Sequence, residues 1–397
     1  MTKILNDPIY GLIDIDSSLI MSLMEHPFFQ RLRRINQLGF THYVYPAATH
    51  TRFSHCVGAM HLMRLTLQVL RSKGVDITDD ESEAVQIAIL LHDLGHGPFS
   101  HSLEYVLIDV PHEQLSEAYM HKLNDEFNGA LDMAIAIFKN TYHKRFLHQL
   151  ISGQLDMDRL DYLTRDSFFT GVTDGKVGYD RIIKTLNVHQ DELVVEFKGI
   201  YSVENFLIAR RLMYWQVYLH KNVVCAGEML KNLIRRVRTL IQLGDSTPLP
   251  KDLLYFLHTH DKKDIEKALH HFHRIDDTDI MYALKLLINH EDFITKFLAE
   301  GILDRRLLRT YFRNHAIKKE DLDKTRQQIK SNFPHLSEEE CAYLLIVGKE
   351  TNQAYRRGNK EIQILLKDGK TRPISEWREH NIVQTEVIKH FACYPKM

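Results

Sequence analysis

Apolar residues recur at helical spacing along most of this chain, and clear alternation with polar residues is confined to three short stretches. The first lies within residues 1–20, where Pro8, Gly11 and the alternating LIDID predict an extended lead or a short hairpin. The second, Leu186 to Gly199, alternates about a polar turn and predicts a β-hairpin. The third predicts two strands around Asp368-Gly369, followed by a last short helix. The pattern therefore predicts a mainly α protein with a small hairpin insertion and a smaller α/β appendage at its C-terminal end.

Start and stop signals divide the helical text. Helical spacing runs from Ser18 to Gly39, with Pro27 marking a boundary, and Thr49 or Thr51 could cap a helix that continues to Gly74. The remaining expected helices begin at Asp79-Asp80, lie within residues 102–150 and 151–171, form one long helix from about residue 202 to 237, and fill most of residues 250–350. Because the texture changes after Thr351, we expect a core in residues 1–240, a helical region in 241–350 and the appendage in 351–397.

Composition narrows the class of protein. The 397 residues are 44% hydrophobic and 26% charged, which is typical of a soluble globular protein. Lys and Arg total 51 against 52 Asp and Glu, so there is no basic excess, and nucleic acid is an unlikely main partner. The four cysteines are scattered without a CxxC pair, and neither a signal peptide nor a membrane-length apolar run is evident. We therefore expect a cytoplasmic protein with free thiols and no membrane partner.

The most informative stretch is ILLHDLGHGPFSH, Ile89 to His101. His92 and Asp93 stand at the end of an apolar helical run, just before a break at Gly95 and Gly97-Pro98. A carboxylate on a core-facing helix is costly unless something positive meets it. A divalent metal ion that shares His92 as a ligand is the simplest candidate.

Two further segments contribute groups of the same kind. Arg52 and His55 share a face in the first turn of their helix. On the helix in 151–171, Asp158, Tyr162 and Asp166 stack at intervals of four, and carboxylates on one stripe repel unless a cation offsets them. Together these segments predict a mixed nitrogen–oxygen site that suits Mn, Fe, Zn, Ni or Mg, with the ligands His55, His92, Asp93 and Asp158.

In this order the motifs resemble those of the HD-domain phosphohydrolases, and more closely the catalytic domain of SAM- and HD-domain-containing deoxynucleoside triphosphate triphosphohydrolases and their bacterial homologues. The text that carries the resemblance is NDPIYGLIDID, FFQRLRRINQLG, YVYPAATHTRFSH, LLHDLGHGPFSH, HEQ, LDMDRLDYLTRD and ARRLMYWQVYLHK. It covers most of residues 3–171, extends to about 221 and fades beyond. The resemblance implies the HD-domain helical fold and a metal-dependent enzyme that converts a dNTP and water into a deoxynucleoside and tripolyphosphate.

The resemblance also implies a role for individual residues. It makes the same four residues the metal ligands, and it makes His112, with Glu104 behind it, the general acid for the leaving nucleoside oxygen. His96 and His101 would face the α-phosphate, and Arg52 would hold a substrate phosphate. The other implied substrate contacts are Gln37, Leu38, Tyr162 and Asp166 around the sugar, Tyr218 packed on it, and Arg159, Arg210 and Lys221 near the phosphates. Two positions depart from the usual pattern, since Glu104 stands where Asp is common and Leu219 where Gln is common.

A second set of residues matches a segment that touches a regulatory nucleotide between subunits in relatives: Lys3, Ile4, Asn6, Glu25, Gln30 and Arg33. We therefore expect a nucleotide-responsive homo-oligomer, a dimer or tetramer. Two alternatives stay open from the sequence. One is a different HD phosphohydrolase that acts on nucleotide mono- or diphosphate esters or cyclic dinucleotides, and the other is a nucleic-acid-binding HD module with weak turnover.

Overall fold

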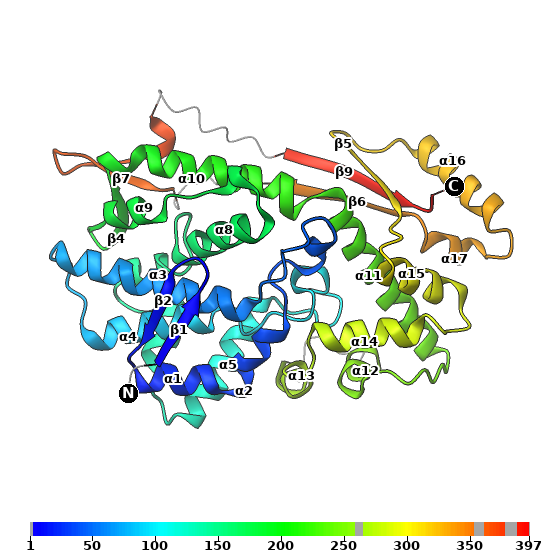
Figure 1. The fold of residues 1–397 in the computed structure, drawn as a ribbon, viewed down its shortest axis with the longest axis horizontal. Coiled ribbons are helices and arrows are strands. Elements are labelled where there is room, and N and C mark those ends of the chain that lie inside the picture. Colours follow the sequence, from blue (N-terminus) through cyan, green and yellow to red (C-terminus); the bar gives the residue numbers. More distant parts are fainter. Residues whose placement is uncertain (1–2, 259–264, 353–360, 378–386, 397) are drawn as a thin grey trace.

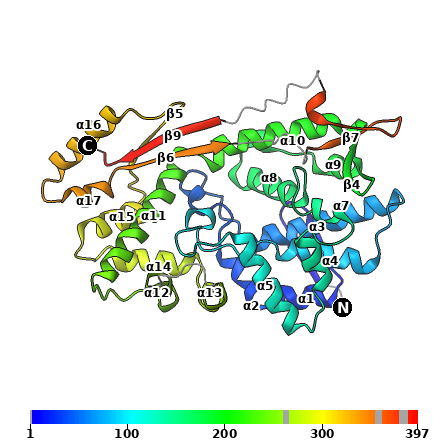
Figure 2. The same ribbon diagram turned by 180° about the vertical axis from the view of Figure 1, so that it is seen from behind.

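The computed structural model describes residues 3–258, 265–352, 361–377 and 387–396, and within them helices predominate, as the sequence predicts (Figure 1). The strands form three small sheets, ordered β1-β2, β3-β4-β7-β8 and β5-β9-β6. The helices up to α9 gather at one end of the long axis, while α11 to α15 with β5, β6 and β9 lie toward the other end (Figures 1 and 2). Among the described residues, no helix combines the length and apolar character needed to cross a membrane.

The chain begins with an antiparallel hairpin, β1 (Lys3–Asp7) and β2 (Gly11–Ile15), which confirms the hairpin expected in residues 1–20. Ser17 caps α1 (Ser18–Glu25) by accepting a hydrogen bond from the Ile20 amide. Pro27 opens α2 (Pro27–Gln30), so it marks the expected boundary, and a 3₁₀ turn over Arg31–Arg34 follows.

Three helices build the centre of the molecule: α3 (Arg52–Ser72), α4 (Asp79–Leu91) and α8 (Met157–Thr170). The helix α3 packs against both of the others, and its Leu62 and Met63 are completely buried. Truncating such a residue to alanine costs about 2–5 kcal/mol, so this packing fixes how the three helices approach one another. Thr51 occupies the N-cap position of α3, as one of the two expected residues, although its side chain makes no capping hydrogen bond. By contrast, Thr78 and Glu81 form a complete capping box at the start of α4.

Shorter helices surround this centre. They are α5 (His112–Glu126), α6 (Asp132–Phe138), α7 (Arg145–Gln149) and α9 (Tyr179–Thr185). The hairpin expected from Leu186 onward is present as β3 (Leu186–His189) and β4 (Glu192–Glu196). In Figure 2, α7 and β4 lie toward the same end of the long axis as the N-terminus.

The single long helix expected over about 202–237 is wrong. The structure has α10 (Ile200–Met213), a π-helical turn over Tyr214–Tyr218, and a separate α11 (Lys221–Gln242). The Leu219 amide returns to the Tyr214 carbonyl at 2.8 Å, a spacing of five residues that ends the helix, and His220 then caps α11. Neither Gly nor Pro marks this break, so local sequence carries no signal for it.

The region expected to be helical over 250–350 contains α12 (Lys251–His258), α13 (Ile265–Phe272), α14 (Asp277–Leu287), α15 (Phe293–Leu303), α16 (Lys319–Asn332) and α17 (Glu338–Ala342). It also contains two strands that were not expected, β5 (Arg309–Arg313) and β6 (Ile346–Asn352). Both pair antiparallel with β9 (Val387–Tyr394), which lies between them.

A last short helix was expected after the two strands, but residues 387–394 form the strand β9. Residues 378–386, where that helix could also have fallen, lie outside the described residues. A segment of eight residues is too short for periodicity to separate strand from helix, and its partners lie far away in the chain. The two strands around Asp368-Gly369 are confirmed as β7 (Gln363–Leu365) and β8 (Thr371–Pro373). Because β7 pairs with β4 and β9 with β5, sheets cross the borders expected between the three regions, and that division stays a prediction.

Candidate metal centre and active site

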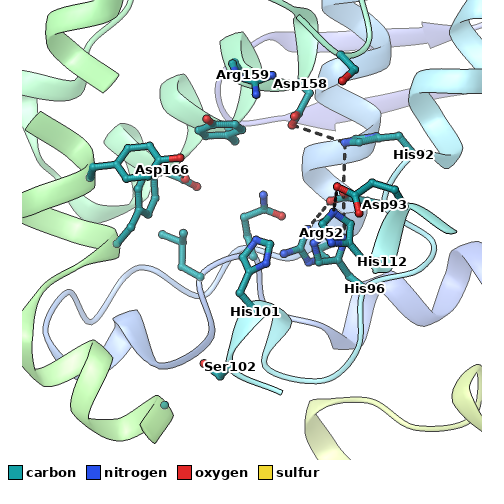
Figure 3. A pocket seen from close by; sticks show the side chains of 18 of the residues that line it. Arg52, His92, Asp93, His96, His101, Ser102, His112, Asp158, Arg159 and Asp166 are labelled. Atoms are coloured by element: carbon teal, nitrogen blue, oxygen red, sulfur yellow. Dashed lines mark hydrogen bonds and ion pairs between the residues drawn. The ribbon is translucent and has the colours of Figure 1, made fainter. Parts of the chain in front are cut away.

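The four predicted metal ligands converge from three helices, although more than a hundred residues separate the first from the last. His55 lies at the end of the first turn of α3, His92 and Asp93 follow the end of α4, and Asp158 lies in the first turn of α8. His55 Nε2 is 3.2 Å and His92 Nε2 is 3.6 Å from Asp158 Oδ1. Asp93 closes the group, with Oδ1 3.3 Å from His92 Nε2 (Figure 3). Its Oδ2 lies 3.8 Å from His55 Nε2.

The two imidazoles are oriented as metal ligands usually are. His55 Nδ1 lies 2.8 Å from Asp161 Oδ2, and His92 Nδ1 lies 2.6 Å from the Ile89 carbonyl. Each bond fixes the ring so that Nε2 faces Asp158. Among the described residues, neither Nε2 atom has a hydrogen-bond partner. Buried nitrogen atoms without such a bond, facing two carboxylates, fit a divalent ion between them.

The electrostatics of the group agree with this fit. Burial alone would raise the pKa of Asp158, but His55 and His92 outweigh it and hold that pKa far below its ordinary value. Burial would likewise lower the pKa of His55, but its contacts with Asp158 and Asp161 raise it to about 10, so a metal ion that binds Nε2 would replace a proton. The carboxylates are therefore ionised at neutral pH, and the site attracts positive charge.

Arg52 lies directly beside this group. Its Nη1 donates to Asp93 Oδ2, and its Nε donates to Ser100 Oγ at 2.9 Å. Only 3% of the residue is exposed, so the guanidinium is held rigidly at the wall of the pocket (Figure 3). Such a group can bind a phosphate oxygen while it keeps one contact to Asp93.

A second group of histidines stands next to the metal ligands, arranged around one carboxylate. Glu104 Oε1 lies 2.7 Å from His112 Nδ1, and Oε2 lies 2.8 Å from His101 Nδ1. Burial would raise the pKa of Glu104, but these two imidazoles hold it well below the ordinary value. Each ring that donates from Nδ1 keeps Nε2 available for other contacts. The pair of His112 and Glu104 expected from the resemblance is thus present as a contact, and Glu104 also serves His101.

His96 completes this group, and a glycine makes its position possible. The His96 ring lies 3.9 Å from the His112 ring, centre to centre, and 96% of the residue is buried. A Cβ added at Gly95 would lie 2.0 Å from the His112 carbonyl, so only glycine lets the loop approach the start of α5 this closely. Ser116, which the sequence did not single out, accepts from the Gly95 amide and donates to the His92 carbonyl. This serine joins the loop to the end of α4.

The residues expected around a sugar line the same pocket, which has a volume of about 770 Å³: Gln37, Leu38, Tyr162, Asp166 and Tyr218. The carboxylate of Asp166 accepts from the Tyr218 hydroxyl and contacts His50 Nε2, both at 2.7 Å. His50 was not expected, because its role appears only once α8 packs against the loop that carries it. Tyr218 is the last residue of the π-helical turn that precedes Leu219.

The basic residues expected near the phosphates do not all reach the pocket. Arg159 lines it and also contacts Asp156. Arg210 is not among the lining residues and lies buried on α10, with its Nη1 3.4 Å from Gln154. Lys221 is also outside the lining and is exposed at the start of α11.

Two lysines that the sequence did not single out line the pocket instead. Lys139 is paired with Glu117 at 2.6 Å, and Lys231 with Glu228 at 2.7 Å. Both acidic partners line the pocket as well. In the sequence these residues are indistinguishable from ordinary surface pairs on helices, so no local signal could have found them.

The residues expected at a regulatory nucleotide lie on the N-terminal hairpin, on the first two helices and on the 3₁₀ turn that follows them, and none of the six is among those lining the pocket. Lys3 Nζ lies 2.9 Å from Glu25 Oε1, and Arg33 donates to Gln30 Oε1 at 2.9 Å. Arg33 also stacks on Phe53. Ile4 and Asn6 are exposed on the outer face of the hairpin.

Comparison with known proteins agrees with this arrangement. The HD domain family matches residues 52–166, and the HD associated region matches residues 177–247. An uncharacterised protein of Bacillus subtilis, YwfO, is 30% identical over 415 residues, covering 99% of this chain and 92% of that protein. The crystal structure of a phosphohydrolase from Bacteroides thetaiotaomicron is similar over the full length of both chains, with 44% identity and a TM-score of 0.95.

More distant relatives have a named activity. The deoxynucleoside triphosphate triphosphohydrolase SAMHD1 homolog of Dictyostelium discoideum is 27% identical over 64% of this chain and 53% of its own length. The SAMHD1 enzyme of Gallus gallus is 28% identical over 65% of this chain and 48% of its own length. The chain thus matches about half the length of these two relatives.

Proposed function

We propose that this chain, which belongs to the HD-domain phosphohydrolase superfamily, is a metal-dependent deoxynucleoside triphosphate triphosphohydrolase. It would convert a dNTP and water into a deoxynucleoside and tripolyphosphate. The observation that carries the proposal is that one pocket of about 770 Å³ is lined by three of the four metal ligands, His92, Asp93 and Asp158, by the three histidines around Glu104 and by the residues expected around a sugar. A volume of this size is ordinary for a small-molecule site.

The reaction requires charge neutralisation, an activated water and a proton for the departing oxygen. Bound to His55, His92, Asp93 and Asp158, a divalent ion would neutralise phosphate charge and lower the pKa of a water molecule. Arg52 is placed to bind a phosphate oxygen next to Asp93. The donor set suits Mn, Fe, Zn, Ni and Mg, and it does not select among them.

In bond terms, a water oxygen forms a bond to the α-phosphorus, and the bond from that phosphorus to the 5′ oxygen breaks. The electron pair goes to the 5′ oxygen, which takes a proton as the nucleoside leaves. His112 would supply this proton, because Glu104 holds its Nδ1 and leaves Nε2 for the substrate. His96 and His101 would contact the α-phosphate from the same side.

At the other part of the pocket, Tyr218 and Asp166 form a pair that can position the sugar. The Asp166 carboxylate is held by His50 and Tyr218, so it can accept from a 3′ hydroxyl with little reorganisation. Tyr162 lies beside Tyr218, with 6.2 Å between ring centres, and its ring would press on C2′ and disfavour a ribose.

We also propose that the hairpin residues Lys3, Ile4 and Asn6, with Glu25, Gln30 and Arg33, bind a regulatory nucleotide at an interface of a homo-oligomer. Their support is the exposed outer face of the hairpin and the adjacent ion pair. Adding dGTP should then raise both the assembly size, followed by sedimentation, and the hydrolysis of a second dNTP. In Lys3→Ala both responses should weaken, and a wild-type protein that ignores dGTP in both assays would contradict this part of the proposal.

One experiment tests the catalytic proposal. Purified protein is incubated with each dNTP and each NTP, with Mn²⁺ or Mg²⁺, and the products are separated by chromatography. Deoxynucleoside with intact tripolyphosphate is the expected result. Mono- or diphosphate products, or turnover of a cyclic dinucleotide alone, would instead indicate a different HD phosphohydrolase.

A matched pair of variants identifies the centre responsible. His92→Ala should lose both turnover and bound metal, with the metal content measured by elemental mass spectrometry. The control His143→Ala removes an exposed histidine outside the pocket lining and should behave as wild type. If metal content is unchanged in His92→Ala, the ligand assignment is wrong.

A further inference from the structure

Behind the metal ligand His55 lies a buried series of hydrogen-bonded side chains of alternating charge, called the relay below, which the catalytic proposal does not use. It runs from His55 to Asp161 and Arg165 on α8, and from there to Asp7 at the end of β1. The first three residues of this relay are completely buried, and Asp7 is 9% exposed. The relay therefore connects the metal centre to the N-terminal hairpin through the inside of the protein.

The first link orients the imidazole. Asp161 Oδ2 lies 2.8 Å from His55 Nδ1, while His55 Nε2 faces Asp158 and Asp93. A carboxylate bonded to the far nitrogen of a ligating histidine fixes the ring and makes its free nitrogen a better donor to a metal. Asp161 is thus placed to act on the metal through His55, without touching the ion.

The second link holds the carboxylate itself. Arg165 donates from Nε to Asp161 Oδ2 at 3.0 Å and from Nη2 to Asp161 Oδ1 at 2.9 Å. This two-pronged contact fixes the plane of the carboxylate, which one hydrogen bond would leave free to turn. A Cβ added at Gly58 would lie 2.1 Å from both Arg165 Nη2 and Asp161 Oδ1, so α3 has a glycine where the pair passes.

The third link reaches the hairpin. Arg165 Nη1 donates to Asp7 Oδ2 at 2.8 Å, and Asp7 Oδ1 accepts from the Ile9 and Tyr10 amides. Asp7 therefore closes the turn between β1 and β2 with one oxygen and holds Arg165 with the other. Displacing the hairpin would leave Arg165 with an unpaired buried donor and would loosen its hold on Asp161.

We propose that Asp161 is a positioning residue for the metal ligand His55, and that Arg165 and Asp7 extend this control to the N-terminal hairpin, so that metal affinity depends on how the hairpin is docked. This inference rests on the proposed metal site. A buried ion pair that served stability alone would not need to end on the imidazole whose other nitrogen faces Asp158.

The test measures metal affinity, because a purely structural role would not change it in folded protein. Metal-free full-length protein is titrated with Mn²⁺ by calorimetry, and the stability of the metal-free form is measured separately by urea unfolding. We expect the dissociation constant for Mn²⁺ to rise roughly 10–100-fold in Asp161→Asn. In Asp7→Asn it should rise by a smaller factor, on the order of 3–10-fold, because the effect passes through Arg165.

Asp16→Asn is the matched control. Asp16 follows β2 and makes a two-pronged contact with Arg64 on α3, the helix that carries His55, but this exposed pair is not connected to His55. The Asp16→Asn variant weakens a carboxylate–arginine contact between the same hairpin and α3, and it should leave the affinity for Mn²⁺ unchanged. The double variant Asp7→Asn with Asp161→Asn should bind Mn²⁺ as Asp161→Asn does, because both changes act on one path.

The outcomes separate the two proposals. Wild-type protein that binds no Mn²⁺ or other divalent ion would overturn the metal site and the relay together. Wild-type binding with unchanged affinity in Asp7→Asn and Asp161→Asn would overturn the relay alone. If Asp161→Asn does not fold, the comparison of Asp7→Asn with Asp16→Asn decides, and equal affinity in these two would also refute the relay.

Discussion

Replacing Glu104 with glutamine tests the histidine group by its geometry. The carboxylate now contacts His112 Nδ1 at 2.7 Å through one oxygen and His101 Nδ1 at 2.8 Å through the other. Glutamine has a single acceptor oxygen and an NH₂ donor, so it can accept from the Nδ1–H group of only one of these rings. The shape of the side chain is almost unchanged, and the main loss is one charge-assisted hydrogen bond.

The expected size of the effect follows from that loss. A hydrogen bond to a charged group contributes about 1.5–3 kcal/mol, which corresponds to roughly 10–150-fold in rate at about 1.36 kcal/mol per factor of ten. We expect kcat for dNTP hydrolysis to fall by about that factor in Glu104→Gln, because His112 donates its proton only when the ring is held. KM should change little, since Glu104 is placed to act on His112 and not on the bound triphosphate.

The assay measures deoxynucleoside released from each dNTP in the presence of Mn²⁺. The matched control is Glu113→Gln. The Glu113 side chain is 65% exposed, and its carboxylate lies 3.5 Å from His112 Nε2. A kcat for Glu104→Gln within about threefold of wild type would refute the role of His112 and Glu104. An equal loss in Glu113→Gln would refute it as well, because an exposed carboxylate cannot orient the ring.

Three further predictions follow from individual contacts. In Tyr218→Phe, Asp166 loses one of its two contacts, and kcat/KM for dNTP should fall about tenfold with metal content unchanged; a normal kcat/KM would remove Tyr218 from the sugar site. Ser116→Ala leaves the Gly95 amide without its acceptor and should lower the free energy of unfolding by about 1–3 kcal/mol in urea, while Ser72→Ala, at an exposed hydroxyl, should not. Burial would raise the pKa of Glu81, but Lys144 and the Thr78 amide hold it below the ordinary 4.5, so its contribution is present above that pH and is lost as the pH falls through the folded-state value. Glu81→Gln should therefore lower the free energy of unfolding by about 1–2 kcal/mol at pH 7. In urea unfolding, the difference in this free energy between wild type and variant should become smaller below pH 4.5, and a difference that does not change with pH would contradict this account.

The local parts of this structure were predictable because the signals for them are local. Pro27 favours the start of a helix through its fixed backbone angle, whatever the tertiary surroundings. The acidic residues Asp79 and Asp80 favour the start of α4 through the charge at a helix N-terminus, which is also a local effect. The hairpins follow from alternation about polar turns, as at Asp368-Gly369, where Gly369 has φ 83°. In each case the residues that decide the structure lie within a few positions of one another.

The errors lie where distant partners decide the structure. The segment 387–394 is a strand because β5 and β6 lie on either side of it, and residues 35 to 85 positions away supply its hydrogen bonds. The break before α11 comes from a π-helical turn that no Gly or Pro announces. Arg210, expected near the phosphates, lies buried on α10 with its guanidinium 5.9 Å from the ring centre of the pocket-lining Tyr214, and its role stays a prediction.

The chemistry of the site divides in the same way. By itself the sequence determined which groups are available, because a His-Asp pair at the end of an apolar helix and an Asp stripe on another require a cation wherever they are buried. Only the tertiary structure decided that His55, His92 and Asp158 face one another, that one carboxylate, Glu104, serves two histidines, and that Asp161 and Arg165 link His55 to the hairpin. The physical reason is that side-chain identity sets what a group can bind, whereas distance and orientation between groups far apart in the chain depend on how whole helices pack.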